Sequence, residues 1–198
     1  MTALALARST ALSAPSDAFR TLATTSDDAL ERIFAASDGP DPEALARWEW
    51  RGFNTPWWTR VLGIQKFIKA FDATSQGRVE GWNIRVTQRG MSAPWTQKPS
   101  PEDPRAFGFF DVRRVDASSR DNRYPRATLL DYGSSPRNRL TKIDDLTMKV
   151  LRDYVVQPDA RDPNVMLGKA YIALGPLRLY SNFFVIERSR PIVKSLTA

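Results

Sequence analysis

Residues 164–188 read NVMLGKAYIALGPLRLYSNFFVIER, and this stretch decides the fold. It holds two runs rich in Val, Ile, Leu, Phe and Tyr, at 164–174 and 179–188, on either side of Gly175-Pro176. β-Branched and aromatic residues favour strands, and Gly-Pro pairs mark turns. Because the connection is too short for a crossover helix, we expect two antiparallel neighbouring strands.

The same pattern of short strand-forming runs and turn clusters continues back along the chain to Trp48. We expect strands near residues 46–53, 66–73, 77–88, 106–115, 126–132, 147–157, 164–174 and 179–188. Closing a sheet of about eight strands removes its two exposed edges. The sequence therefore predicts a mainly β fold, an antiparallel up-and-down β-barrel of about eight strands, with an interior wide enough for side chains or one small ligand.

The N-terminal part of the chain has a helical pattern instead. Between residues 16 and 37 the apolar side chains recur at near-helical spacing, and Pro42 suits the start of a short helix. We therefore divide the chain into a flexible N-terminal extension, a helical segment, the β-barrel domain and a C-terminal tail, at residues 1–15, 16–47, 48–190 and 191–198.

The extension is rich in Ala, Leu, Ser and Thr, carries Arg8 and lacks acidic residues. This composition loosely resembles an organelle-targeting peptide, whereas a frayed extension of a cytoplasmic protein explains it as well. We expect a cytoplasmic location.

Histidine and cysteine are both absent from the 198 residues. Their absence removes the usual ligands of zinc, haem and iron–sulfur clusters, and the usual nucleophile–base pairs of hydrolases. No glycine-rich phosphate loop stands between a predicted strand and a helix. We therefore predict no metal, no cofactor and no assignable catalytic residue.

The chain carries 29 Lys and Arg against 22 Asp and Glu, a formal net charge of +7. Such a charge attracts anionic membranes or acidic proteins at long range. The cations are scattered and no nucleic-acid-binding motif is present, so we expect no specific nucleic-acid partner. The oligomeric state is not predicted.

Side chains alternate between the two faces of a strand. Arg152 and Tyr154 therefore share one face of the sixth predicted strand, Lys169 and Tyr171 share one face of the seventh, and Phe183 lies on one face of the eighth. If these faces point inward, they form a pocket for a ligand with an apolar body and an anionic or carbonyl head. If they point outward, the cations are ordinary surface side chains.

Aromatic residues are densest between Trp48 and Trp58. Trp57 and Trp58 lie in PWWTRVLG, residues 56–63, which favours a short helix or a lid. A lid of this kind would cover a ligand or touch a membrane with its amphipathic rings, whereas the structural alternative is a core plug at the first strand.

Four segments, ARWEWRGF (46–53), RATLLDY (126–132), LGKA (167–170) and FFVIER (183–188), resemble small uncharacterised bacterial proteins of the GXWXG and DUF4334 type. More distantly, they are similar to lipocalin-like, calycin barrels. Lipocalins carry Gly-x-Trp on their first strand and often stack an arginine of the last strand on that tryptophan. Here Trp50 precedes Gly52, and Arg188 ends the last strand. The resemblance implies that Trp50 and Arg188 are a structural closure pair and that the barrel binds a small hydrophobic molecule.

The sequence thus predicts a non-catalytic carrier or sensor of a lipid, fatty acid or pigment-like molecule, bound by Trp57, Trp58, Arg152, Tyr154, Lys169, Tyr171 and Phe183. Two alternatives stay open. One is a barrel enzyme of isomerase, cyclase or lyase type, with proton transfer by Tyr154, Tyr171, Lys169 or Glu187. The other is a basic adaptor that docks on an acidic protein or a membrane surface.

Overall fold

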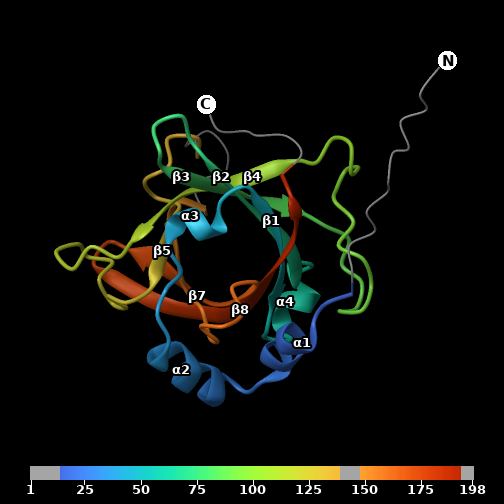
Figure 1. The fold of residues 1–198 in the computed structure, drawn as a ribbon, viewed down its shortest axis with the longest axis horizontal. Coiled ribbons are helices and arrows are strands. Elements are labelled where there is room, and N and C mark those ends of the chain that lie inside the picture. The colour runs from blue at the N-terminus through green and yellow to red at the C-terminus, as the bar shows by residue number, and fades with distance from the viewer. Residues whose placement is uncertain (1–13, 139–147, 193–198) are drawn as a thin grey trace.

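The computed structural model describes residues 14–138 and 148–192. Its strands form one closed antiparallel sheet in which each strand pairs with the next and the last pairs with the first (Figure 1). The strands are β1 (Trp48–Asn54), β2 (Lys66–Ala73), β3 (Val79–Arg85), β4 (Ala106–Arg114), β5 (Thr128–Asp131), β6 (Leu151–Val156), β7 (Val165–Leu174) and β8 (Leu177–Pro191). The predicted up-and-down barrel is confirmed.

The strand boundaries differ most from the expected ones in β3, β6 and β8. β3 is shorter than the range 77–88, because residue 86 onward belongs to a long connection that leaves the sheet. β6 begins at Leu151, and the expected start at Thr147 lies outside the described residues. β8 extends to Pro191 and pairs with both β7 and β1 along its length.

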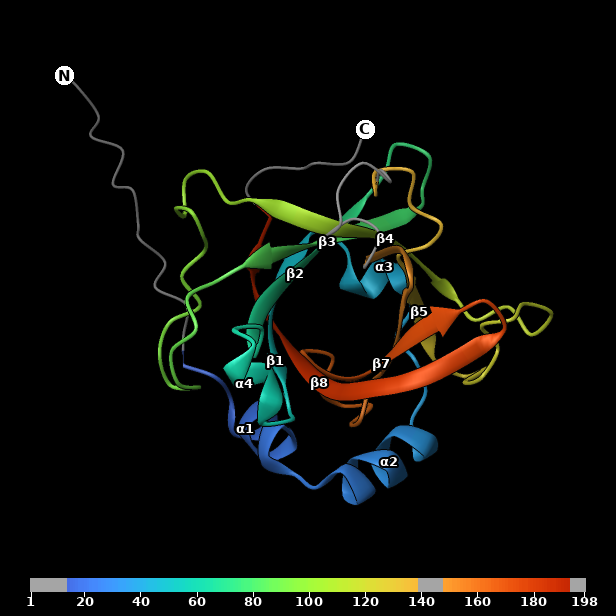
Figure 2. The same ribbon diagram turned by 180° about the vertical axis from the view of Figure 1, so that it is seen from behind.

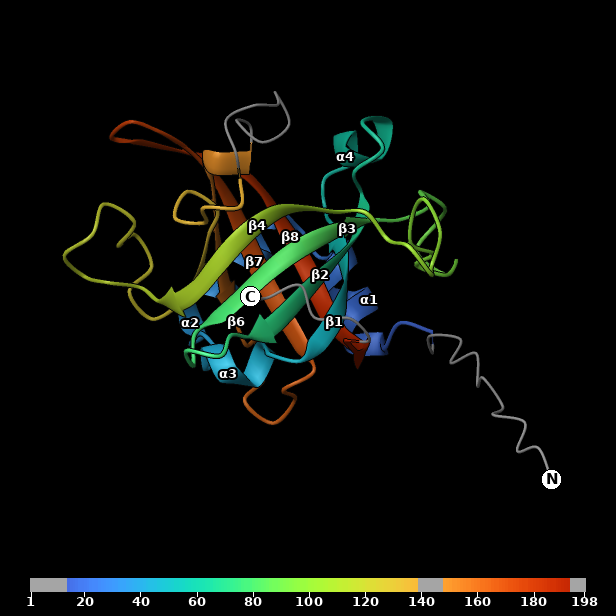
Figure 3. The same ribbon diagram turned by 90° about the horizontal axis from the view of Figure 1, so that it is seen from above.

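The described helices are α1 (Asp17–Thr24), α2 (Asp27–Ala36), α3 (Pro42–Leu45) and α4 (Trp58–Val61). Ser16 caps α1 by accepting a hydrogen bond from the Phe19 amide, and Pro42 opens α3, where a missing N–H costs nothing. α1 and α2 lie outside the ring of strands (Figure 2). α3 lies at one end of the barrel, and α4 at the other (Figure 3).

One contact identifies which side chains point into the barrel. β2 and β6 are four strands apart in either direction around the ring, so their side chains meet only through the interior. The Lys69 ammonium of β2 and the Asp153 carboxylate of β6 are 3.0 Å apart. Side chains that alternate in phase with these two therefore face inward, among them Trp50, Phe71, Phe110, Leu130, Val155 and Phe184.

The opposite face of the strands is also largely apolar, because helices and a loop cover it. Phe19 of α1 and Phe34 of α2 belong to one buried cluster with outward-facing residues such as Leu167 and Val185. Residues 86–105 fold back over the outer face, and Trp95 donates a hydrogen bond to the Gly52 carbonyl at 3.0 Å. Where helices or this loop cover them, the strands are consequently buried on both sides.

Three cross-strand pairs inside the barrel place a phenylalanine ring over a glycine. The pairs are Gly52 with Phe67, Gly81 with Phe110, and Gly168 with Phe184. A Cβ added to Gly168 would lie 2.1 Å from the Phe184 ring. These glycines thus make room for large rings in a narrow interior.

The two ends of the barrel are named here after their helices. The α3 end carries α3 and the connections at 74–78, 115–127 and 157–164. The α4 end carries the connections at 55–65, 86–105 and 175–176, and the described residues 132–138 and 148–150 between β5 and β6.

Candidate functional site

A polar cluster crosses the middle of the barrel. The Lys69 ammonium donates to Asp153 Oδ2 at 3.0 Å, to Asn83 Oδ1 at 3.0 Å and to the Tyr132 hydroxyl. Tyr132 in turn donates to Asp153 Oδ2 at 3.0 Å, and the Asn83 amide donates to the Gly108 carbonyl at 3.0 Å. All four side chains are buried, and the cluster holds one positive and one negative charge.

Aromatic rings surround the Lys69 ammonium. Its Nζ lies between 5.0 and 5.4 Å from the ring centroids of Phe67, Phe110, Tyr132 and Phe184. Burial lowers the pKa of Lys69, and the charge of Asp153 opposes that effect. Burial raises the pKa of Tyr132 well above its usual value, and Asp153 raises it further, so this phenol is a hydrogen-bond donor rather than an acid.

Local sequence patterns place these four groups. Lys69 alternates with Phe67 and Phe71 on β2, and all three point inward. Tyr132 directly follows β5, where Asn138 fixes the chain by donating to its carbonyl at 2.8 Å. Asp153 pairs in register with Leu130 and Ala170, so its carboxylate enters the interior between two apolar positions.

The interior differs on the two sides of this cluster. Toward the α3 end, aromatic rings pack in sequence, with centroids 6.3 Å apart for Trp50 and Phe71 and 5.4 Å apart for Phe71 and Phe110. Toward the α4 end, three apolar side chains packed against the interior core are only half-buried, namely Phe67, Met148 and Leu151. Trp48 and Ala73, which pack against the same core toward the α3 end, are also half-buried, so half-buried apolar side chains lie on both sides of Lys69.

The residues expected to line an interior pocket lie on the outer face of the barrel instead. Arg152, Tyr154, Lys169, Tyr171 and Phe183 alternate out of phase with Asp153, Gly168 and Phe184, which point inward. The more apolar face of a strand is not the inner one here, because α2 and the connection 115–127 cover the outer face and both faces are therefore apolar. The alternative of exposed surface cations is also wrong for Lys169, which is buried.

Lys169 occupies a second cage of aromatic rings under α2. Its ammonium pairs with Glu31 and donates to the Tyr124 hydroxyl at 2.7 Å. Five ring centroids lie within 6 Å of it, those of Phe34, Tyr124, Tyr171, Tyr180 and Phe183. This cluster ties α2 and the connection 115–127 to β7.

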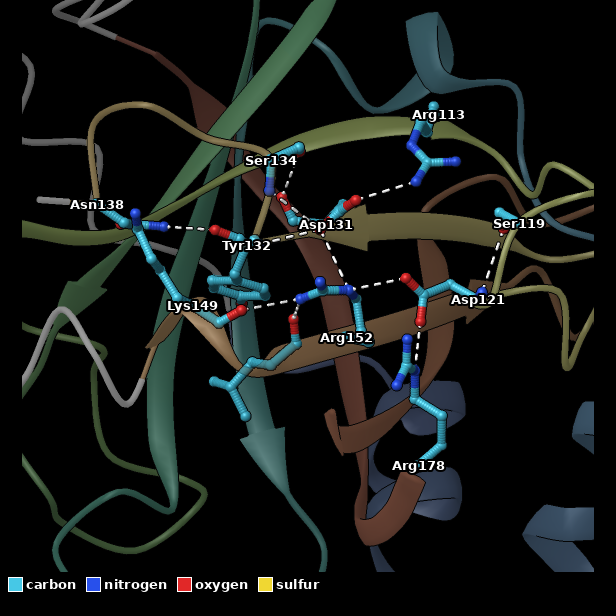
Figure 4. A network of polar contacts seen from close by, with 12 residues as sticks. Arg113, Ser119, Asp121, Asp131, Tyr132, Ser134, Asn138, Lys149, Arg152 and Arg178 are labelled. Atoms are coloured by element: carbon cyan, nitrogen blue, oxygen red, sulfur yellow. Dashed lines mark hydrogen bonds and ion pairs between the residues drawn. The ribbon is translucent and has the colours of Figure 1, made fainter. Parts of the chain in front are cut away.

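Arg152 belongs to a chain of alternating charges on the outer face (Figure 4). Its Nε lies 3.0 Å from Asp121 and 3.2 Å from Asp131, while Arg178 binds the other oxygen of Asp121. Arg113 completes the chain at 2.9 Å from Asp131. Tyr154 adds a hydrogen bond to the Asp121 carbonyl at 3.1 Å. The network fastens the connection 115–127 onto β5, β6 and β8.

The remaining predicted site residues lie at the two ends. Trp57 precedes α4 with 77% of its surface exposed, and Trp58 is half-buried. Trp50 and Arg188 are partners in the register of β1 and β8, and the guanidinium carbon lies 5.1 Å from the Trp50 ring centroid. Beside them, a cleft of about 680 Å³ at the α3 end is lined by Arg47, Trp48 and Arg188 among others.

Sequence reasoning missed Lys69, Asn83 and Tyr132 as site residues. A signal for Lys69 was present, because it is the single charge between Phe67 and Phe71 in an otherwise apolar run. Asp153 is one of several acids on the predicted strands, and nothing in its spacing along the sequence selects a partner. Asn83 and Tyr132 carry no sequence signal that separates them from core or turn residues.

The fold and this interior define the class of the protein as a closed antiparallel barrel with an aromatic-lined, polar centre. Searches of family models, curated proteins and solved structures with this chain find no match. Within the described residues, no group of three or more His, Cys, Asp or Glu is placed to hold a metal ion. None of the helices described is long and apolar enough to cross a membrane.

Proposed function

We propose that the protein binds a small molecule with an apolar body and a polar head inside the barrel, on the α4 side of Lys69, as a carrier or sensor. The head binds at Lys69 and Asn83, where it replaces one of the three hydrogen bonds that the Lys69 ammonium donates to Asp153, Asn83 and Tyr132. The apolar body lies against Phe67, Leu151 and Phe184. This places the ligand at residues other than those predicted from the sequence, with the same ligand chemistry.

The Lys69–Asp153 ion pair inside the barrel is the observation that carries the proposal. Removing two charges from water costs several kcal/mol per ion, and apolar replacements of similar size are often neutral or stabilising. A core built for stability alone gains little from such a pair. A cation held among aromatic walls, beside half-buried apolar side chains, suits recognition of a carboxylate, carbonyl or hydroxyl on an apolar molecule.

Kinship with the GXWXG, DUF4334 and calycin barrels is part of this proposal. The stacking of Arg188 on Trp50, where the first and last strands meet, supports it. In that reading the α3 end is the closed end of the barrel and the ligand enters from the α4 end.

The proposal is tested by titrating a fluorescent fatty acid, such as a dansyl-labelled undecanoate, into three proteins. They are the wild type, Lys69→Met/Asp153→Leu, and the matched control Lys169→Met/Glu31→Leu, which removes the caged ion pair on the outer face. We expect the wild type and the control to bind the probe, and the interior double variant to bind it at least about tenfold more weakly, the loss of roughly one charged hydrogen bond.

Native mass spectrometry of the purified wild type provides a second readout, in which a co-purifying small molecule appears as a mass shift that the interior double variant lacks. Equal probe affinity of all three proteins would overturn the assignment of Lys69. A protein that carries no small molecule from its host and binds neither the dansyl probe nor a neutral apolar dye would overturn ligand binding in the interior.

Proton transfer is the second candidate function, favoured by the Tyr132 hydroxyl that contacts both Lys69 and Asp153. If the protein is an isomerase, cyclase or lyase, the proton-transfer groups are Lys69, Tyr132 and Asp153. The residues expected for that role from the sequence, Tyr154, Tyr171, Lys169 and Glu187, all lie on the outer face. Tyr132→Phe distinguishes the two functions. A carrier keeps its probe affinity within a few-fold, whereas an enzyme of this kind loses turnover of a bound substrate and keeps its affinity.

A further inference from the structure

The exposed large hydrophobic side chains are confined to one end of the molecule. Across the part of the chain that the structure describes, they all lie in two segments, residues 57–64 around α4 and residues 174–180 at the β7–β8 turn. Exposure reaches 77% for Trp57, 75% for Val61 and 58% for Leu177. Scattered exposed apolar residues are ordinary, but a concentration at one end marks an interaction surface.

The two segments project from the same end of the barrel, away from α3 (Figure 3). Hydrogen bonds connect their bases, because Asn182 donates to Asn54 at 2.8 Å and Asn54 donates to the Ile64 carbonyl at 2.7 Å. The apolar side chains thus stand on two segments that project from the same end, with connected bases and with tips on different sides of that end (Figure 3). Insertion of these turns into an interface would require no change of the fold.

Among the described residues of the four connections at this end, cations outnumber acids, while Asp121 pairs with Arg178 of the β7–β8 turn. Three of the four connections have no Asp or Glu among their described residues. One carries Arg60, the next carries Arg137 and Lys149, and the turn at 175–176 has no charge. The fourth, 86–105, folds back over the outer face and has three cations against two acids. The connections at the α3 end mix both signs, with the acids Asp116, Asp121, Asp159 and Asp162.

Apolar turns with cations beside them fit one kind of partner. Tryptophan and leucine side chains insert into the region between headgroups and acyl chains, while lysine and arginine attract anionic lipids at about 1 kcal/mol each near the surface. We propose that the α4 end docks on the surface of a bilayer that contains anionic lipids, with Trp57, Val61 and Leu62 and the turn residues Leu174, Leu177 and Leu179 entering the interface. This inference goes beyond ligand binding and does not depend on it.

The test is co-sedimentation of the ligand-free full-length chain with vesicles of pure phosphatidylcholine and of phosphatidylcholine with 30% phosphatidylserine. We expect partition onto the anionic vesicles at least about tenfold stronger than onto neutral ones, and a decline as salt rises. Leu62→Ser/Leu177→Ser removes apolar contacts, and Arg60→Glu reverses a charge at the docking end. Each is expected to lower partition by about tenfold or more.

Arg161→Glu is the matched control, because Arg161 is an exposed arginine in a connection at the α3 end. It is expected to bind anionic vesicles as the wild type does, and circular dichroism verifies that every variant is folded. Docking is overturned if the wild type binds neither kind of vesicle, or if the two docking-end variants bind like the control. A dimer that sedimentation detects in the wild type and that Leu62→Ser/Leu177→Ser dissociates would assign the surface to a second copy instead.

Discussion

Lys69 and Asp153 form an ion pair, with 3.0 Å between Nζ and Oδ2, that joins two strands on opposite sides of the barrel. The surrounding rings and the lack of exposure leave little water to screen either charge. Each charge consequently depends on the other, and on Asn83 and Tyr132, for its hydrogen bonds. Removal of one member of the pair should therefore lower the stability of the fold strongly, whereas removal of both members should lower it much less.

Lys69→Met alone is expected to lower the free energy of unfolding by about 3–5 kcal/mol, because it leaves an uncompensated carboxylate in the interior. Lys69→Met/Asp153→Leu is expected to restore most of that loss. Urea unfolding followed by tryptophan fluorescence measures both variants and gives their coupling energy. Additive effects of the two substitutions would contradict the dependence of each charge on the other.

The close approach of the Phe184 ring to Gly168 predicts that a side chain added at position 168 lowers the stability of the fold. Gly168→Ala places a methyl group 2.1 Å from the ring, so the ring must move within a packed interior, at a cost of about 1–3 kcal/mol. Phe184→Leu in the same chain supplies room and recovers part of the loss. Thermal or urea unfolding measures the difference. Gly175→Ala is not a suitable control because Gly175 has a positive φ, whereas Gly90→Ala adds a methyl group where no neighbour lies within 4 Å.

The positions of the strands could be predicted from the sequence, but the strand faces that point into the barrel could not. Strand positions follow from local signals, such as Gly175-Pro176 between two β-branched and aromatic runs, and so does the short helix at Pro42. Which face of β6 and β7 points inward depends on what covers the other face, and α2 and Tyr124 are far from these strands in sequence. The partner of Lys69 was unpredictable for the same reason, since Asp153 comes 84 residues later.

Asp121 anchors the outer-face network, and its removal is expected to loosen the connection 115–127. Burial raises the pKa of this carboxyl, but the hydrogen bonds from Arg178 and Arg152 prevail and hold it below its usual value. Asp121→Asn is expected to lower the free energy of unfolding by about 2–3 kcal/mol at pH 7, the value of a lost hydrogen bond to a charged group.

The sign of the pH effect follows from that lowered pKa. The contribution of Asp121 is fully present above its pKa in the unfolded chain, near 3.8, and is lost as the pH falls through its lower pKa in the folded protein. The difference in unfolding free energy between the wild type and Asp121→Asn is therefore expected to shrink below about pH 4. A difference that stays constant down to pH 2 would show that the carboxylate charge contributes nothing.

The lowered pKa of Lys66 predicts that the stability of the fold also changes with pH in the alkaline range. Its ammonium is 3.8 Å from the Trp95 ring centroid and donates to the carbonyls of Gly90, Ala93 and Pro94. Burial, and secondarily the charge of Arg51, lower its pKa from 10.5 to about 8. Between these two pH values the unfolded chain binds a proton that the folded protein has released. The free energy of unfolding therefore rises with pH in this window, by at most about 1.4 kcal/mol per pH unit.

Lys66→Met removes the titrating group but keeps the fluorescence of Trp95, so urea unfolding of both proteins from pH 7 to pH 10 isolates the effect. Loss of the three hydrogen bonds shifts the variant by a constant amount, whereas only the titration changes the difference with pH. A difference that does not change from pH 8 to pH 10 would mean that Lys66 keeps its proton in the folded protein.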